Sequence, residues 1–309
     1  MRLYGPRNVR KSPVLKILYK MQLPNLRHCF PFFQKKKTMQ HLNINGSKIP
    51  KLGFGTWQLK GENATEMVQV ALDAGYRHID TAQIYKNEEE VGRGIRNSGV
   101  ARPDIFLTTK VWTDEFKNNF AGSVETSLKK LGTDEVNLLL IHWPHQELPL
   151  DAYLEKLVRV QERGLTQHIG VSNFPTELMR EAHSMAPQII TNQVEYHPTL
   201  NQDQVLDTAR EFGWSVTAYS PIGQGEVLKN ETLIEIGKKY GKSPVHVALR
   251  WLIQQEDVMA IPRSSSADHV RDNFDIWDFE LSPSDFQTVH DLRLENKRIV
   301  DPDFAPAWD

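Results

Sequence analysis

The sequence has very little cysteine and no long apolar run, and each shortage excludes a class of site. Cys29 is the only cysteine among the 309 residues. Residues 39–309 can therefore form neither a disulfide nor a site that uses cysteine as a metal ligand or nucleophile. No apolar run approaches the ~20 residues that a membrane-spanning helix requires. We expect no membrane partner and a cytoplasmic location.

Acidic residues are missing from residues 1–38, which hold ten Lys or Arg, while residues 39–309 carry 27 basic and 39 acidic residues. A body with a net charge of −12 argues against nucleic acid as a partner. The basic segment has the charge balance of a transit peptide, but it is poor in serine and interrupted by Pro13, Pro24 and Pro31. We prefer an extension upstream of a domain that starts at Met39, disordered or absent from the mature protein.

Several familiar motifs are also missing. Gly53-Phe-Gly-Thr-Trp-Gln58 lacks the third glycine of the dinucleotide fingerprint, and Ile236 stands where a phosphate loop at 237–243 would need its first glycine. Neither a GxSxG nor an HExxH motif occurs. His142 and His145 form an HxxH pair, but Pro144 prevents helical presentation and no third ligand is evident. We expect no metal.

What the sequence does contain is a regular alternation of strand-like and helix-like segments. Asn45-Gly46, between two short alternating segments, predicts a hairpin first. Eight strands follow, at 52–56, 76–80, 105–110, 136–141, 168–172, 189–193, 214–219 and 258–261, with helices at about 63–74, 88–98, 118–131, 151–163, 175–185, 202–213, 230–241 and 244–255. This α/β pattern predicts a single (β/α)8 TIM barrel over residues 39–309, with the hairpin plugging one end. An open doubly wound sheet is the alternative.

In such a barrel the carboxyl ends of all strands meet at one rim, where the chemistry takes place. The residues at these ends are unusually polar and aromatic: Thr56, Trp57, Asp80, Lys110, His142, Trp143, Ser172, Asn173, Gln193, Tyr219 and Arg263. Each has an ordinary interpretation when taken singly, such as a surface lysine, a helix-capping aspartate or a packed core histidine. The joint pattern favours an active site.

Four side chains suit the reduction of a carbonyl group. A Lys110 ammonium beside Tyr85 would lower the pKa of the phenol and make it a proton donor, while Asp80 would keep the lysine charged and in place. His142 would donate a hydrogen bond to the carbonyl oxygen of the substrate. No protein side chain donates hydride, so this chemistry requires a nicotinamide cofactor.

Residues at the ends of the later predicted strands could bind that cofactor. Tyr219 presents an aromatic face for the nicotinamide, and its carboxamide could bond to Ser172, Asn173 and Gln193. The loop Ser220-Pro-Ile-Gly-Gln-Gly225 could present backbone N–H groups to a pyrophosphate. Arg263-Ser-Ser-Ser266 opens the next helix and suits a 2′-phosphate.

Residues 40–309 resemble the aldo-keto reductase family. The resemblance is carried by Leu52-Gly-Phe-Gly-Thr-Trp57, Gly75-Tyr-Arg-His-Ile-Asp-Thr-Ala-Gln-Ile-Tyr85, Leu138-Leu-Leu-Ile-His-Trp-Pro144, Gly170-Val-Ser-Asn-Phe174, Asn192-Gln-Val-Glu-Tyr-His-Pro198 and Ile261-Pro-Arg-Ser264. The ending Ala305-Pro-Ala-Trp-Asp309 is similar to the branch of bacterial 2,5-diketo-D-gluconate and methylglyoxal reductases.

The resemblance implies a monomeric NADPH-dependent reductase of small aldehydes and ketones, with a catalytic tetrad of Asp80, Tyr85, Lys110 and His142. It implies a substrate pocket lined by Trp57, Trp112, Tyr85, His142 and a C-terminal loop. It also implies cofactor contacts at Thr56, Ser172, Asn173, Gln193, Tyr219, Ser220, Ile222, Gln224, Arg263, Ser264, His269 and Asn273.

One position departs from the family pattern. An arginine often helps to clamp the 2′-phosphate where this chain has His269, and a histidine is mostly neutral at pH 7 and lacks a bidentate fork. We expect NADP preference to rest mainly on Arg263.

Two other functions compete with the reductase. A nicotinamide-binding regulatory or structural barrel with little turnover has no evident need for all four tetrad groups. A metal-dependent lyase or isomerase would need carboxylate or histidine ligands clustered at the rim.

Overall fold

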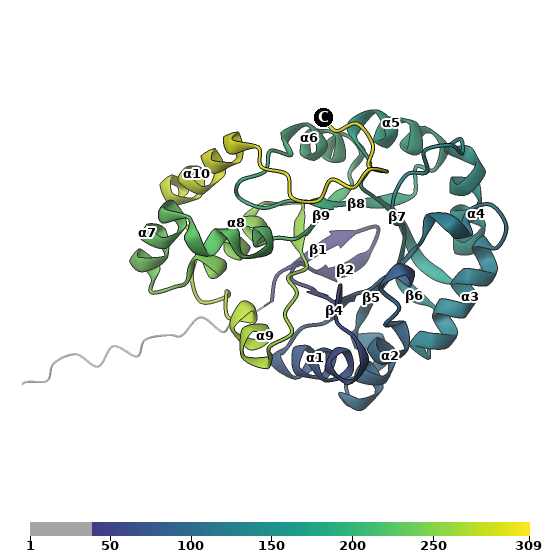
Figure 1. Cartoon of the computed structure of the whole chain (residues 1–309), viewed down its shortest axis with the longest axis horizontal. Helices are drawn as coiled ribbons and strands as arrows, with labels where there is room; N and C mark the ends of the chain where they lie inside the picture. The colour runs from purple at the N-terminus through teal and green to yellow at the C-terminus, as the bar shows by residue number, and fades with distance from the viewer. Residues whose placement is uncertain (1–38) are drawn as a thin grey trace, which may run out of the picture. The chain divides into compact units, whose positions relative to one another are not determined.

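The computed structural model describes residues 39–309, so the predicted extension over residues 1–38 lies outside the described residues. Eight parallel strands form one curled sheet in sequence order, from β3 to β10. Helices surround this sheet (Figure 1). The strands are β3 (Phe54–Gly55), β4 (His78–Asp80), β5 (Phe106–Val111), β6 (Val136–Ile141), β7 (Thr166–Ser172), β8 (Ile189–Glu195), β9 (Ser215–Tyr219) and β10 (Val258–Ala260).

The sheet closes between its first and last strands. Leu52 forms a parallel bridge with Ala260. The amide of Gly53 donates to the carbonyl of Ala260 at 2.9 Å, and the amide of Gly55 donates to the carbonyl of Pro262 at 3.0 Å. The predicted (β/α)8 barrel is confirmed, and the open doubly wound sheet is excluded.

The outer layer follows the predicted strand–helix alternation. It consists of α1 (Gly61–Ala74), α2 (Glu88–Asn97), α3 (Phe120–Leu131), α4 (Asp151–Glu162), α5 (Thr176–Met185), α6 (Asp203–Phe212), α7 (Glu231–Tyr240), α8 (Pro244–Gln254), α9 (Ala267–Phe274) and α10 (Pro283–Asp291). The helix α10 was not predicted. Among residues 39–309, no helix is long and apolar enough to cross a membrane.

The predicted hairpin is present and covers the amino end of the barrel. Strands β1 (His41–Ile44) and β2 (Ser47–Pro50) pair antiparallel. Asn45 and Gly46 both have positive φ, of 48° and 78°, as a two-residue turn of type I′ requires. Leu42 and Ile49 pack against the inner strand residues, which are Phe106, Leu138, Leu140, Ile190 and Met259. This second core fills the barrel and closes the end opposite the strand carboxyl ends.

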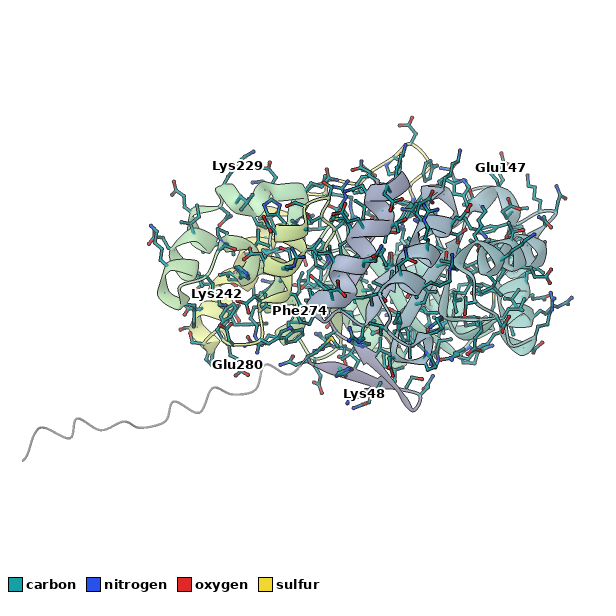
Figure 2. All side chains as sticks on the ribbon, turned by 90° about the horizontal axis from the view of Figure 1, so that it is seen from below. Lys48, Glu147, Lys229, Lys242, Phe274 and Glu280 are labelled. Carbon is teal, nitrogen blue, oxygen red and sulfur yellow. The ribbon has the colours of Figure 1, made fainter. Side chains whose placement is uncertain are left out.

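Figure 2 shows the two ends of the barrel from the side. Lys48 of the hairpin lies at one end, and Glu147, in the loop between β6 and α4, lies at the other. The hairpin that closes the barrel and the loops that follow the strands are therefore at opposite ends of the barrel, as is usual for this fold.

His78 in β4 makes the stability of the barrel depend on pH. Its ring is fully buried, and burial lowers its pKa from 6.5 to about 4 against opposing contributions from Asp80 and the Pro50 carbonyl. Between these two pH values the unfolded chain binds a proton that the folded chain does not, so the free energy of unfolding falls as pH decreases. The loss attributable to His78 is roughly 3 kcal/mol by pH 4.

Urea unfolding at pH 7, 5 and 4 tests this prediction. We expect His78→Gln to show a weaker decrease in stability with falling pH than the unsubstituted chain, and His269→Gln, at an exposed position, to show the same decrease. Parallel pH profiles for the unsubstituted chain and His78→Gln would contradict the assignment.

Candidate active site

A cavity of about 660 Å³ opens at the carboxyl ends of the strands. One part is lined mainly by apolar side chains: Trp57, Ile84, Trp112, Trp143, Val300, Pro302 and Phe304. The other part is lined by Ser220, Ile222, Gln224, Arg263, Ser264 and His269. Asp80, Tyr85 and His142 also line this cavity. A separate cavity of about 730 Å³ lies beside the hairpin, with Lys51, Trp214 and Asp257 in its lining.

Asp80 and Lys110 form a buried ion pair beneath the cavity. Asp80 is the last residue of β4, and Lys110 is the next-to-last residue of the neighbouring strand β5. Asp80 is in register with Thr108 on β5. Lys110 Nζ lies 2.5 Å from Asp80 Oδ1 and donates to the Thr81 carbonyl at 3.0 Å, and both charged side chains are almost fully buried. Gln193 Nε2 donates to the other carboxylate oxygen at 2.8 Å. The pair is therefore held rigidly and is satisfied by hydrogen bonds, which a buried pair requires.

Tyr85 follows β4 in a short 3-10 helix, η1 (Gln83–Tyr85), and its ring lies over this pair. The ammonium of Lys110 is 5.1 Å from the ring centroid. Burial and the nearby Asp80 carboxylate raise the pKa of Tyr85 well above 10. The predicted net lowering of the pKa of Tyr85 is wrong, because the removal of the phenol from water outweighs the effect of the nearby Lys110 charge. Tyr85 therefore keeps its proton at neutral pH.

His142 directly follows β6 and completes the group. Its ring packs edge-on against those of Tyr85 and Trp112, at centroid distances of 5.6 and 5.3 Å. Burial and the charge of Lys110 lower its pKa well below 6.5, so the imidazole is neutral and has one N–H to donate. Its Nδ1 is buried and has no hydrogen-bond partner among residues 39–309. The structure thus brings together all four residues predicted to form the tetrad.

The predicted cofactor residues fall into two groups. Those that line the cavity are Thr56, Asn173, Gln193, Tyr219, Ser220, Ile222, Gln224, Arg263, Ser264 and His269. Ser172 and Asn273 do not belong to this lining. Ser172 bonds instead to Gln193 and Asn173, and Asn273 is buried in the last turn of α9. Tyr219 donates to Asn173 Oδ1 at 2.8 Å, which fixes the orientation of its ring.

Arg263 lines the cavity from the segment between β10 and α9. Its Nε donates to the carbonyl of Trp57 at 2.9 Å. Within residues 39–309 its guanidinium makes no ion pair, so the cation has no carboxylate to compete with an anionic ligand. Ser264, Ser265 and His269 line the cavity beside it.

The residues after 296 form the predicted loop, which we call the C-terminal tail (residues 297–309). Val300, Pro302 and Phe304 enter the cavity lining. Phe304 packs edge-on against Trp112 and Trp143 at 5.9 and 5.3 Å. The tail therefore forms one wall of the apolar part.

Sequence analysis missed several residues that organise the site. Asn87 is fully buried, accepts from Thr81 Oγ1 at 2.8 Å, and donates to the carbonyls of Thr56 and Leu59. It joins the loop after β3 to the loop that carries Tyr85. No spacing rule singles it out, because its partners are backbone atoms of a segment 31 residues away.

The site is divided along the chain. Asp80, Tyr85, Lys110 and His142 come from three successive strands of the first half of the barrel, whereas the cavity residues from Asn173 to His269 come from the second half. Hydrogen bonds that join the halves here include Gln193 to Asp80 at 2.8 Å, Asn173 Nδ2 to the His142 carbonyl at 3.0 Å, and Arg263 Nε to the Trp57 carbonyl at 2.9 Å. Among the described residues, no group of three His, Asp, Glu or Cys side chains could hold a metal ion.

A closed parallel barrel with a buried ion pair, a phenol and an imidazole at its carboxyl rim defines an α/β-barrel enzyme. Residues 51–293 match the model of the aldo/keto reductase family. The chain belongs to this family of oxidoreductases, as its sequence motifs predicted.

Relatives of known activity cover most of the chain. Glyoxal reductase of Bacillus subtilis is 41% identical over 267 residues, which span 84% of this chain and 94% of the relative. Methylglyoxal reductase DkgB of Salmonella typhi is 39% identical over 267 residues, which span 84% and 99%. A solved structure of a candidate 2,5-diketo-D-gluconic acid reductase B is similar at a TM-score of 0.86 and 45% identity, and the match covers 88% of this chain and 98% of that one.

Proposed function

We propose that the protein is an NADPH-dependent reductase of aldehydes and ketones, with small 2-oxo carbonyls such as methylglyoxal or 2,5-diketo-D-gluconate as substrates and Tyr85 as the proton donor. The observation that carries this proposal is the placement of a neutral phenol over a buried Lys110–Asp80 pair, next to a neutral imidazole, at a cavity of about 660 Å³. The reductase names of the relatives support the same activity.

The described residues fit a nicotinamide dinucleotide. Tyr219 offers an aromatic face whose orientation is fixed by Asn173, and Arg263 offers to the same cavity a cation that makes no ion pair within residues 39–309. We propose that Tyr219, Asn173 and Gln193 hold the nicotinamide end, and that Arg263, Ser264 and His269 hold the 2′-phosphate end. When bound there, the cofactor would supply the hydride.

The side chains of the tetrad would handle the proton. His142 would donate its N–H to the carbonyl oxygen of the substrate and orient it toward Tyr85. Tyr85 would give its phenolic proton to that oxygen as hydride reaches the carbonyl carbon, and the product is an alcohol. The phenolate left behind would be stabilised by the Lys110 ammonium, which lies 5.1 Å from the ring centroid, until a proton from solvent restores the phenol. Asp80 would hold Lys110 in place.

The substrate end of the cavity is mainly apolar. Asp80 and Arg263 are the Asp, Glu, Lys or Arg residues in the described lining, and Arg263 is the residue that we assign to the cofactor. An uncharged carbonyl such as methylglyoxal therefore suits the pocket better than the carboxylate of a diketo-gluconate, whose charge would lack a cation at this end.

The proposal is tested by following NADPH oxidation by the purified full chain with methylglyoxal and with 2,5-diketo-D-gluconate. Turnover that depends on Tyr85 supports the reductase. Binding of NADPH without turnover of any carbonyl would reject it in favour of a regulatory nicotinamide-binding barrel. Loss of activity on treatment with a chelator would contradict a metal-independent reaction.

Cofactor preference provides a separate prediction. We expect Arg263→Ala to have about equal kcat/KM with NADPH and NADH, because His269 lacks the charge and the bidentate geometry to replace the lost guanidinium. Steady-state kinetics with both cofactors measure the effect. Arg271→Ala is the control, since Arg271 lies on the same helix as His269 but is outside the cavity lining. An unchanged preference in Arg263→Ala would remove the proposed role.

A further inference from the structure

The C-terminal tail is attached to the barrel at both ends and along its length: the backbone N–H of Lys297 donates to the Thr199 carbonyl, and the Asp309 carboxylate accepts from Thr176. Between these points, one buried carboxylate holds the tail beside the cavity. Glu195 is the last residue of β8 and is completely buried. Its Oε1 accepts the backbone N–H of Ile299 at 2.8 Å, and its Oε2 accepts the backbone N–H of Val300 at 2.8 Å. A single side chain thus binds two consecutive amides of a segment more than one hundred residues away along the chain.

The carboxylate is itself held in place. His197 Nε2 lies 3.0 Å from Glu195 Oε1, and Thr199 Oγ1 lies 3.1 Å from His197 Nδ1. A carboxylate only accepts hydrogen bonds, so the ring donates to it through Nε2, and Nδ1 forms a hydrogen bond with the Thr199 hydroxyl. Both Glu195 and His197 are fully buried. Because an ionised acceptor makes stronger hydrogen bonds than a neutral one, this arrangement favours a rigid attachment.

The attachment point adjoins both parts of the cavity. Glu195 is in register with Tyr219 on the neighbouring strand β9. Val300, which it binds, lines the apolar part, as do Pro302 and Phe304 farther along the tail. Figure 1 shows the tail, in yellow, running across the strand ends and finishing near α5. A shift of the amides at 299 and 300 would therefore move the wall that Phe304 forms.

We propose that Glu195 is a positioning residue that sets substrate selectivity by fixing the C-terminal tail as a wall of the pocket. It does not reach the reacting atoms, so its effect is exerted through Val300 and Phe304. The kinetic part of this inference rests on the proposed reductase function, whereas the attachment itself does not.

Amide hydrogen exchange tests the attachment without any need for activity. In the full chain, Glu195→Gln replaces one accepting oxygen with an NH2 group that cannot accept, so exchange at Ile299 and Val300 should accelerate by about tenfold or more. Glu155→Gln, which alters an exposed acid on α4, should leave exchange at these positions unchanged. Unchanged exchange in Glu195→Gln would overturn the inference whether or not the protein is a reductase.

Kinetics separate a positioning role from a general structural one. For benzaldehyde, whose ring would extend to Phe304, Glu195→Gln should raise KM about tenfold with kcat reduced less than threefold, and for methylglyoxal the rise in KM should be smaller. A uniform fall in kcat for both substrates, with unchanged KM, would contradict the positioning role. If neither substrate is reduced by the unsubstituted chain while exchange responds as expected, the reductase proposal fails and the attachment stands.

A second variant removes the donor from the tail rather than the acceptor from the core. Ile299→Pro lacks the N–H that Glu195 Oε1 accepts and leaves the barrel interior unaltered, so it tests the inference even if Glu195→Gln fails to fold. It should reproduce the rise in KM for benzaldehyde. In a Phe304→Ala background, Glu195→Gln should add little to KM, because the wall that Glu195 positions has been removed. If the effects of Glu195→Gln and Phe304→Ala on KM are fully additive, Glu195 does not act through Phe304 and the proposal is overturned.

Discussion

Tyr85→Phe is expected to lower kcat for NADPH-dependent reduction of methylglyoxal by about 10²- to 10⁴-fold, the range for loss of a general acid. Binding of NADPH should change little, because the ring remains and only the hydroxyl is lost. The expected loss of kcat follows from the surroundings of the phenol. Burial and Asp80 raise its pKa well above 10, so Tyr85 carries its proton throughout the neutral range and has one to give.

The measurement is kcat and the dissociation constant for NADPH on both forms of the enzyme. Tyr76→Phe is the matched control: Tyr76 is also fully buried, but its hydroxyl donates to the Val270 carbonyl at 3.3 Å and does not line the cavity. We expect that control to keep its kcat. Retention of kcat within threefold in Tyr85→Phe would show that another group supplies the proton.

Lys110→Met is expected to lower the free energy of unfolding more than any of the other single substitutions. It leaves the Asp80 carboxylate, which is 1% exposed, without its cation. Removal of one partner from a buried ion pair costs about 3–5 kcal/mol, because the remaining charge is uncompensated. Turnover should also be lost, since the phenolate formed at Tyr85 would have no neighbouring ammonium.

Urea unfolding can separate the charge effect from the loss of packing. The double variant Asp80→Asn/Lys110→Met removes the unpaired charge and should be more stable than Lys110→Met alone. Lys238→Met, which breaks an exposed pair with Glu235, should change stability by no more than about 1 kcal/mol. If the double variant is no more stable than Lys110→Met, the cost arises from packing and not from the charge on Asp80.

Most of the fold could be predicted because its strands are apolar on both faces. The segment 136–141 was predicted with its observed bounds, β5 is shifted by one residue from the predicted 105–110, and β9 starts one residue after the predicted 214. The predicted strand at 52–56 contains only the two-residue β3, and Gly53 and Gly55 each make a single backbone hydrogen bond, to Ala260 and Pro262, at this closure of the barrel. Helix α10 was missed because it is short and contributes little apolar surface, with Val289 as its one fully buried apolar residue.

The residues of the candidate site were easier to predict than their electrostatics. A strand end marks Asp80 and Lys110 in the sequence, but the degree to which Tyr85 is removed from water depends on rings from other strands, such as that of His142. The direction of the pKa shift of Tyr85 was therefore predicted wrongly. The role of Glu195 was also out of reach, because its two amide partners lie 104 and 105 residues away.

The division of the site between the two halves of the barrel has a consequence for how such an enzyme can be altered. The groups proposed to move the proton are encoded before residue 143, and nearly all of those proposed to hold the cofactor are encoded after residue 172. Recombination at a crossover point between these segments could therefore exchange cofactor preference while leaving the acid intact. A chimera made in this way needs to preserve the bonds that join the halves, among them Gln193 to Asp80, Asn173 to His142 and Arg263 to Trp57.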